Sequence, residues 1–284
     1  MTFIFRVCGR KRCEAFLMRI APGIALGLFL YYNGYKQTKE GAAVVKQDQL
    51  WPGGFRFFFD DGLFQPGTDS FLLGSFPRLR RGARVCDLGA GTGLLGLLLL
   101  AREPSLQVTN VELQEAAVEL ARQNAALNGL SDRVANLWVD LRDKTRLPPA
   151  GTFDLVVSNP PYFDAARGAV AKGTERGLAR ADCTCTLPQL CAAAARLLRH
   201  GGSFCLVFRV ERMAELFACL QSCTLEPKRL RLVQNTAQSA PKLLLLEARK
   251  GGKPGLSVAA PLLLRGPDGG ESEELAQIYF RDKE

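Results

Sequence analysis

The sequence has little histidine and no regular cysteine spacing. Only one histidine, His200, occurs in 284 residues, and nine cysteines are scattered along the chain. Zinc sites usually use paired Cys-x₂-Cys or His spacings, which are missing here, so we predict no metal site. The closest grouping is Cys183-x-Cys185 followed by Cys191. An odd number of cysteines in mostly apolar surroundings is typical of reduced, buried thiols in a cytosolic protein.

The chain also lacks an apolar run long enough to cross a bilayer. The main candidate, residues 20–32, is thirteen residues long and is interrupted by Pro22 and Gly23, whereas a spanning helix needs about 20 residues. No clear small-x-small cleavage site follows it. We interpret residues 1–43 as an extension outside the folded domain, or as a start assigned too early. An interfacial helix that contacts a membrane and a targeting signal are the alternatives.

Positive charge is distributed unevenly. The net charge is +9, of which residues 1–43 carry +5 and residues 44–284 carry +4. A mildly basic body permits a nucleic-acid partner without requiring one, because such binding depends on local basic contacts. Repeats and low-complexity tracts are absent, which favours a single folded domain over residues 44–284. Within it, residues 44–80 are predicted to cover a cofactor and residues 250–284 to form a tail.

Strand and helix patterns alternate in the middle of the chain. Strands are predicted at residues 84–88, 106–112, 134–140, 153–158, 203–208, 229–233 and 243–249. Helices are predicted to end near residue 102 and to span residues 114–128, 187–198 and 211–219. Repeated βα units predict an α/β fold with a doubly wound, mostly parallel sheet of seven strands, whose last two strands form an antiparallel hairpin.

A glycine-rich turn follows the first of these strands, with the sequence Asp87-Leu-Gly-Ala-Gly-Thr-Gly93. The pattern from Gly91 to Gly96 also fits a nicotinamide dinucleotide site. However, the Asp87 carboxylate would repel a pyrophosphate and attract an ammonium group, which favours S-adenosylmethionine. Glu112, ending the next strand, could accept both ribose hydroxyls, and Asp140 could reach the adenine edge. The predicted cofactor residues are Asp87, Gly89, Gly91, Gly93, Glu112 and Asp140.

A rigid tetrapeptide, Asn159-Pro-Pro-Tyr162, follows the strand at residues 153–158. Each proline fixes φ and restricts the residue before it, so the Asn159 side-chain carbonyl and the Pro160 main-chain carbonyl are held in place. Tyr162 offers a ring on which a base could stack. Earlier in the chain, Thr68 or Asp69 either caps a helix or covers the cofactor.

These motifs, in this order and spacing, resemble the class I S-adenosylmethionine-dependent methyltransferases that modify amines in planar, amide-like systems. Residues 67–74, Ala179-Arg180 and residues 264–268 further resemble one branch, the bacterial tRNA adenine-N6 methyltransferases. Those enzymes act on the adenosine at position 37, beside the valine anticodon. The resemblance covers about residues 47–281. It implies a cytoplasmic enzyme, expected to be a monomer, with S-adenosylmethionine as cofactor and tRNA as partner.

The tetrapeptide suggests a mechanism for methylating such an amine. If the Asn159 Oδ1 and the Pro160 carbonyl each accept one N–H, the nitrogen becomes more tetrahedral and its lone pair points at the methyl group. Tyr162 would stack on the extruded base. No metal or covalent intermediate is needed.

The substrate is less closely defined by these residues. The same tetrapeptide serves protein glutamine N5-methyltransferases, and close variants serve rRNA guanine N2-methyltransferases. A nicotinamide oxidoreductase and a non-catalytic RNA-binding or cofactor-sensing module are alternatives from other classes. Two basic groups favour RNA over protein. The predicted RNA contacts are Arg167, Lys172, Arg176 and Arg180 in the loop after the tetrapeptide, and Lys228, Arg229 and Arg231 near the closing hairpin.

Overall fold

The computed structural model describes residues 2–9, 12–19, 45–60, 66–160 and 185–283. The chain divides into two compact units, Met1–Ala43 and Val44–Glu284. In the first unit, β1 (Thr2–Gly9) pairs antiparallel with β2 (Arg12–Arg19). The apolar run at residues 20–32 lies outside the described residues. Within the described ranges, no helix combines the length and apolar character needed to cross a membrane.

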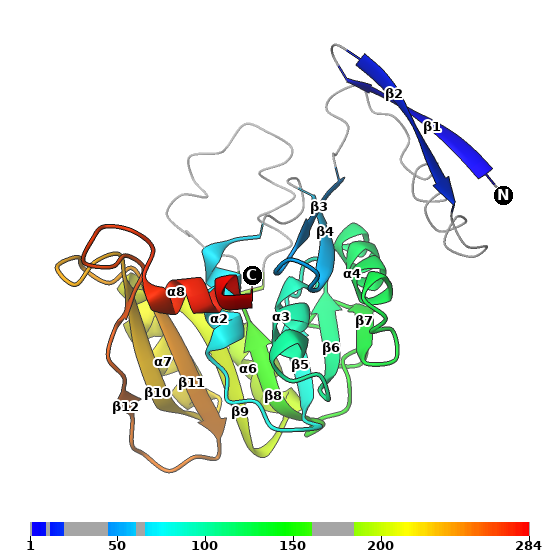
Figure 1. Cartoon of the computed structure of the whole chain (residues 1–284). Coiled ribbons are helices and arrows are strands. Elements are labelled where there is room, and N and C mark those ends of the chain that lie inside the picture. The colour runs from blue at the N-terminus through cyan, green and yellow to red at the C-terminus, as the bar shows by residue number, and fades with distance from the viewer. Residues whose placement is uncertain (1, 10–11, 20–44, 61–65, 161–184, 284) are drawn as a thin grey trace, which may run out of the picture. The chain divides into compact units, whose positions relative to one another are not determined.

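The second unit is built on a mostly parallel sheet (Figure 1). In the described part of the chain it has nine strands in the order β12-β10-β11-β9-β8-β5-β6-β7, with β13 paired to β10. The strands are β5 (Arg84–Leu88), β6 (Gln107–Glu112), β7 (Val134–Trp138), β8 (Phe153–Ser158), β9 (Leu198–Arg209), β10 (Leu225–Gln234), β11 (Leu243–Lys250), β12 (Ser257–Val258) and β13 (Leu262–Leu263). All seven predicted strands are present, and the antiparallel hairpin of β10 and β11 is confirmed. The two short strands extend that edge.

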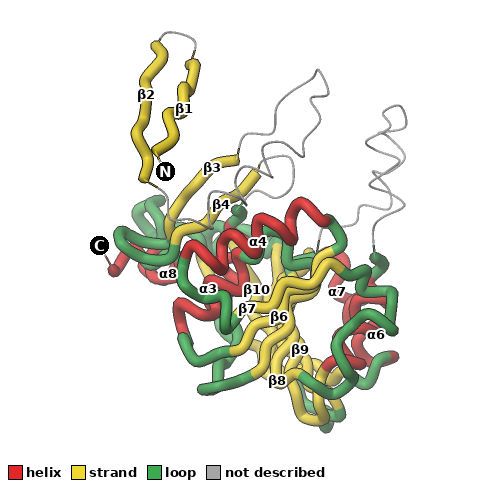
Figure 2. The backbone as a smooth tube through the Cα atoms, turned by 90° about the vertical axis from the view of Figure 1, so that its right-hand side faces the viewer, coloured by secondary structure: helices red, strands yellow, loops and turns green. Residues whose placement is uncertain are grey.

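Helices cover both faces of the sheet (Figure 2). They are α2 (Thr68–Ser75), α3 (Leu94–Arg102), α4 (Glu115–Leu127), α6 (Leu187–Leu197), α7 (Met213–Ser222) and α8 (Glu273–Ile278). Alternate strand residues enter two cores: Cys86 and Val156 pack with α6 and α7, whereas Val85 and Val157 pack with α2, α3 and α8. Strands buried on both faces explain the nearly continuous apolar runs seen in the sequence.

Several strand boundaries differ from the sequence prediction, among them those of β7, β9 and β10. The strand predicted at residues 203–208 begins earlier, because residues 198–202 also belong to β9, whose register against β8 shifts between Phe153 and Leu155. Gly201 has φ of 75°, which accommodates this irregularity. β7 ends at Trp138, so Asp140 lies two residues beyond the strand rather than at its end.

A two-stranded ribbon packs against α4 through two asparagines. The ribbon consists of β3 (Val45–Gln49) and β4 (Arg56–Asp60), paired antiparallel. Asn124 accepts the Phe58 N–H at 2.6 Å and donates to the Phe58 carbonyl at 3.0 Å and the Thr92 carbonyl at 2.8 Å. Asn128 makes the same paired contacts with Arg56 at 2.8 and 2.6 Å. Asn124 therefore joins the ribbon to the glycine-rich turn.

We predict that Asn124→Ala lowers the free energy of unfolding by about 3 kcal/mol. The substitution leaves buried backbone groups of β4 and of the glycine-rich turn without a hydrogen-bond partner. Asn128→Ala is the matched control one helical turn away. Its contacts with Arg56 are exposed, so water can replace them. The free energy of unfolding should therefore fall by only about 1 kcal/mol. Urea unfolding measures both, and equal losses would contradict the linking role of Asn124.

Candidate active site

Three parallel strands bring the predicted site residues to one edge of the sheet. β5 lies between β6 and β8, and Asp87 is in register with Asn110 on one side and Val157 on the other. The carboxyl ends of these strands meet where ligands bind in open α/β sheets. Asp87, Glu112 and Asn159 are therefore neighbours in the fold, although they are far apart in the sequence.

The glycine-rich turn needs glycine for its backbone. Gly89, Gly91 and Gly93 have φ of 73°, 53° and 77°, a region that residues with a Cβ rarely adopt. A Cβ on Gly93 would also come within 3.0 Å of the Asn110 side chain and 3.2 Å of Ala121. Nothing lies within 4 Å of a Cβ built on Gly89, so the turn leaves open space on that side for a ligand.

Glu112 is fixed by the backbone of the same turn. Its Oε2 accepts the Gly91 N–H at 2.9 Å, and its Oε1 accepts the N–H groups of Leu113 and Gln114, each at 2.9 Å. A carboxylate has about four acceptor positions, so these bonds leave room for a further hydroxyl. The sequence predicted that Glu112 binds a ribose, but it did not predict these hydrogen bonds to the backbone.

Asp87 is buried without a hydrogen-bond donor. The residue is 1% exposed, and neither carboxylate oxygen has a partner among the described residues. Nearby, Thr92 Oγ1 and Asn110 Oδ1 also have none. Burial, and then the adjacent Glu112 carboxylate, raise the pKa of Asp87 to about 8. A cationic ligand group would supply both the missing donor and the missing charge.

Asn159 is held by a serine on α2. Its Nδ2 donates to the Ser70 Oγ at 3.1 Å, and Ser70 is 2% exposed. Just before it, the Ser158 hydroxyl donates to the Leu88 carbonyl at 2.7 Å, which fixes the end of β8 against β5. Because Ser70 engages the amide nitrogen, the Asn159 Oδ1 remains as an acceptor. Residues 67–74 were part of the family resemblance in the sequence, but no pattern there predicted this role for Ser70.

The start of α2 differs from the capping prediction. Gly67 is the N-cap residue, and neither Thr68 nor Asp69 caps the helix because both lie in its first turn. The Thr68 Oγ1 instead accepts the Tyr279 hydroxyl at 2.8 Å, which connects α2 to the C-terminal segment. Helix α2 is thus attached at one end to the tail and through Ser70 to the tetrapeptide.

Asp140 is paired with an arginine that the prediction overlooked. The Arg142 guanidinium donates through Nε and Nη2 to both carboxylate oxygens of Asp140, at 2.6 to 2.9 Å. These hydrogen bonds hold the pKa of Asp140 below its ordinary value. Arg142 must rearrange, or be shared, if Asp140 is to accept a hydrogen bond from adenine.

The basic cluster on β10 is largely paired inside the protein, and its assignment as an RNA surface stays a prediction. Arg229 is bonded to Glu247 and to the Phe76 carbonyl, and its side chain is 21% exposed. Arg231 forms a bidentate ion pair with Glu274. Lys228 is half-buried and donates to the Lys253 carbonyl at 2.9 Å.

The other predicted substrate residues lie outside the described residues. They are Tyr162, Arg167, Lys172, Arg176 and Arg180. A cavity of about 290 Å³ does lie at the same sheet edge, where β9 ends and β11 begins. Asp69, Arg209 and Lys242 line it, and Asp69 precedes the serine that holds Asn159. Arg209 and Lys242 were not singled out from the sequence, because each is an isolated basic residue beside an apolar strand.

The thiols show no metal-binding arrangement. Across the residues that the structure describes, no group of three or more histidine, cysteine, aspartate or glutamate side chains could hold a metal ion. Cys191 is buried and Cys185 half-buried, and burial raises the pKa of Cys185 to about 11. Cys183 lies outside the described residues.

This arrangement suits a cofactor with a cationic head group and a substrate amine beside it. A family model described as "Methyltransferase small domain" matches residues 58–224. A solved structure of a predicted O-methyltransferase from Agrobacterium tumefaciens superimposes with a TM-score of 0.61 at 24% identity, covering 75% of this chain and 95% of that one. The fold and the site therefore place this chain among the class I methyltransferases.

Curated relatives identify the branch. A protein of Yersinia pseudotuberculosis named "tRNA1(Val) (adenine(37)-N6)-methyltransferase" is 32% identical over 85% of this chain and 96% of its own length. Proteins with the same name in Cronobacter sakazakii and Porphyromonas gingivalis are 35% and 34% identical, and they are covered over 87% and 73% of their lengths. The chain belongs to this methyltransferase family. Its predicted fold class and family are thus confirmed.

We predict that Asp87→Asn stabilises the ligand-free protein increasingly as the pH rises. The raised pKa means that between roughly pH 4 and 8 only the unfolded state carries the Asp87 charge. Each pH unit in that interval then weakens the unaltered protein by up to about 1.4 kcal/mol relative to the asparagine variant. Urea unfolding at several pH values measures the difference. A difference that does not change with pH would show that Asp87 is already ionised in the fold.

Proposed function

We propose that this protein transfers a methyl group from S-adenosylmethionine to the exocyclic N6 amine of an adenosine in tRNA, at position 37 of the valine tRNA anticodon loop. The observation that carries the proposal is the oriented Asn159 amide, held by Ser70 at the sheet edge next to the unpartnered Asp87 carboxylate. The names of the relatives favour adenine over the guanine and glutamine alternatives, which share the tetrapeptide.

The chain's residues fit the cofactor. The buried oxygens of Asp87 have no donor among the described residues, and an ammonium group would provide one. The open side of Gly89 allows close approach of a ligand to the backbone, and Glu112 keeps an acceptor position for a ribose hydroxyl. Asp140 would accept from adenine once Arg142 shifts. When bound, S-adenosylmethionine supplies an electrophilic methyl group on a sulfonium centre.

The chain's contribution to the chemistry is orientation. The Asn159 Oδ1 and the Pro160 carbonyl accept the two N–H groups of the adenine amine, which turns its lone pair away from the ring and toward the methyl group. Tyr162 stacks on the base and sets its plane. Both acceptors sit on backbone that the prolines and the Ser158 hydrogen bond hold rigid, so little reorganisation is needed at the transition state.

Basic groups would hold the RNA. Arg167, Lys172, Arg176 and Arg180 follow the tetrapeptide in the sequence, and Lys242 and Arg209 line the cavity where β9 ends and β11 begins. These residues would contact phosphates, which position the RNA without reading its sequence. A tRNA substrate places the enzyme in the cytoplasm, and we propose that it acts there as a monomer.

We predict that Asn159→Ala lowers methyl transfer by about 100-fold or more, the usual effect of losing one preorganised contact to the transition state. Cofactor affinity should change less than about twofold, because Asp87 and Glu112 are untouched. Labelled cofactor incubated with total bacterial tRNA, followed by mapping of the modified nucleotide, measures turnover and site together. Methylation of a release factor instead of tRNA would establish the glutamine alternative, and undiminished turnover would remove Asn159 from the mechanism.

We also predict that Ser70 acts as a positioning residue. Ser70→Ala removes the hydroxyl that fixes the Asn159 amide, so kcat should fall about tenfold while the KM for tRNA and the cofactor affinity stay nearly constant. Ser70→Thr keeps a hydroxyl and should restore most of the rate. If both variants lose activity together with thermal stability, Ser70 serves packing rather than orientation.

A further inference from the structure

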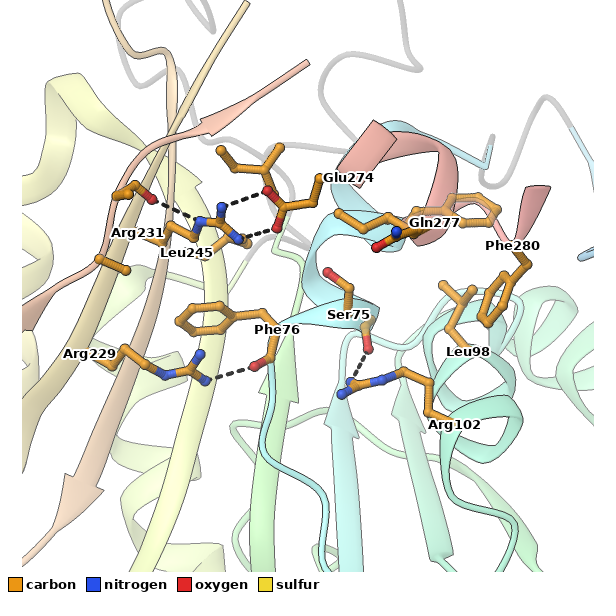
Figure 3. A pocket seen from close by; sticks show the side chains of 16 residues that line it. Ser75, Phe76, Leu98, Arg102, Arg229, Arg231, Leu245, Glu274, Gln277 and Phe280 are labelled. Carbon is orange, nitrogen blue, oxygen red and sulfur yellow. Dashed lines mark hydrogen bonds and ion pairs between the residues drawn. The ribbon is translucent and has the colours of Figure 1, made fainter. Parts of the chain in front are cut away.

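A second and larger cavity lies apart from the sheet edge that carries the candidate active site (Figure 3). Its volume is about 540 Å³, and it is bounded by α2, the end of α3, β10 and α8. Asp87, Glu112 and Asn159 do not line it. It is distinguished by three arginines, Arg102, Arg229 and Arg231, facing one lining carboxylate, Glu274.

Arg102 has carbonyl partners but no counter-charge. Its Nη1 donates to the Gly74 carbonyl at 2.6 Å and its Nη2 to the Pro77 carbonyl at 3.1 Å. No carboxylate within the described ranges forms an ion pair with it, whereas Arg229 and Arg231 are paired with Glu247 and Glu274. Its remaining N–H groups are available to a ligand, because the side chain stays accessible to solvent.

Arg229 brings a second guanidinium toward the first. It stacks on the Phe76 ring at 3.7 Å and donates through Nε and Nη2, so its Nη1 has no partner among the described residues. Figure 3 shows the Arg102 and Arg229 guanidinium groups pointing toward each other beneath α2. Partial burial and then this like charge lower the pKa of Arg102. An anion between the two groups would relieve the repulsion.

The geometry points to a binding site for a small phosphate monoester. Two guanidinium groups from separate elements converge with N–H groups that no described residue uses. A phosphate offers three oxygens to both groups, whereas one guanidinium already satisfies a carboxylate. Phe71, Leu98, Ile278 and Phe280 form apolar walls beside the guanidinium groups, which suits a ligand with a non-polar body. Because the cavity lies apart from the candidate active site, this site does not depend on the proposed methyl transfer.

Titration with inorganic phosphate, followed by calorimetry and thermal unfolding at constant ionic strength, tests the site. The full chain should show saturable binding that chloride does not reproduce, and phenyl phosphate should bind at least about fivefold more tightly through the apolar walls. Ser75 lines the cavity next to Arg102, so Ser75→Glu would supply the missing carboxylate. That variant should fold stably and lose the phosphate response, whereas Ser75→Gln, matched in size but neutral, should keep most of it.

The outcomes separate the possible ligands. Loss of phosphate binding in Ser75→Glu alone supports the site. An absent response in the unaltered protein, or an equal response in the two Ser75 variants, overturns it. If a short RNA phosphodiester without a terminal phosphate binds as tightly as phenyl phosphate, the cavity is a contact for the RNA backbone and the monoester assignment is wrong. Circular dichroism of both variants shows whether a lost response reflects lost fold.

Discussion

A carboxylate buried without a donor governs the candidate active site. Asp87 ends a central strand, and no described residue donates to either of its oxygens, although burial of a charge is costly unless it is paired. The surrounding residues increase that cost rather than relieve it, because the Glu112 carboxylate lies close enough to raise the pKa of Asp87 further. The fold tolerates this arrangement because the strand is held on both sides by β6 and β8. A cationic ligand group at this position would offset the cost.

Helix α2 connects the acceptor side of the site to the rest of the domain. Ser70 holds the Asn159 amide, Thr68 accepts the Tyr279 hydroxyl, and the carbonyls of Gly74 and Phe76 accept from Arg102 and Arg229. One short helix is therefore anchored by the C-terminal segment, by α3 and by β10. Movement of any of these would reach the Asn159 amide through the single hydrogen bond that it donates to Ser70. This explains why the tail belongs to the functional domain although it lies far from Asn159 in the sequence.

Sequence patterns predicted the strands, the glycine turn and the tetrapeptide, because each depends on local periodicity or on backbone preference. Gly89, Gly91 and Gly93 all adopt a positive φ in the glycine-rich turn that the sequence predicted. Partnerships across the chain were not predictable in the same way. The sequence around Ser70 does not indicate that it accepts a hydrogen bond from Asn159. The sequence around Arg142 likewise does not indicate that it pairs with Asp140. Such contacts arise from how elements distant in sequence are brought together.

The arginines of β10 show that spacing in the sequence does not reveal how basic residues are paired in the fold. Arg229 and Arg231 are spaced as alternate strand residues, which suggests one exposed basic face. That face is covered by α2 and α8, and the carboxylates of Glu247 and Glu274 reach the two guanidinium groups there. Much of their charge is thus neutralised within the protein, although the Arg229 Nη1 has no partner among the described residues and can still meet a small anion in the cavity. Lys242 and Arg209 line the cavity nearer the edge where Asn159 lies, and they are further described basic residues at which the predicted contact with nucleic acid can be tested.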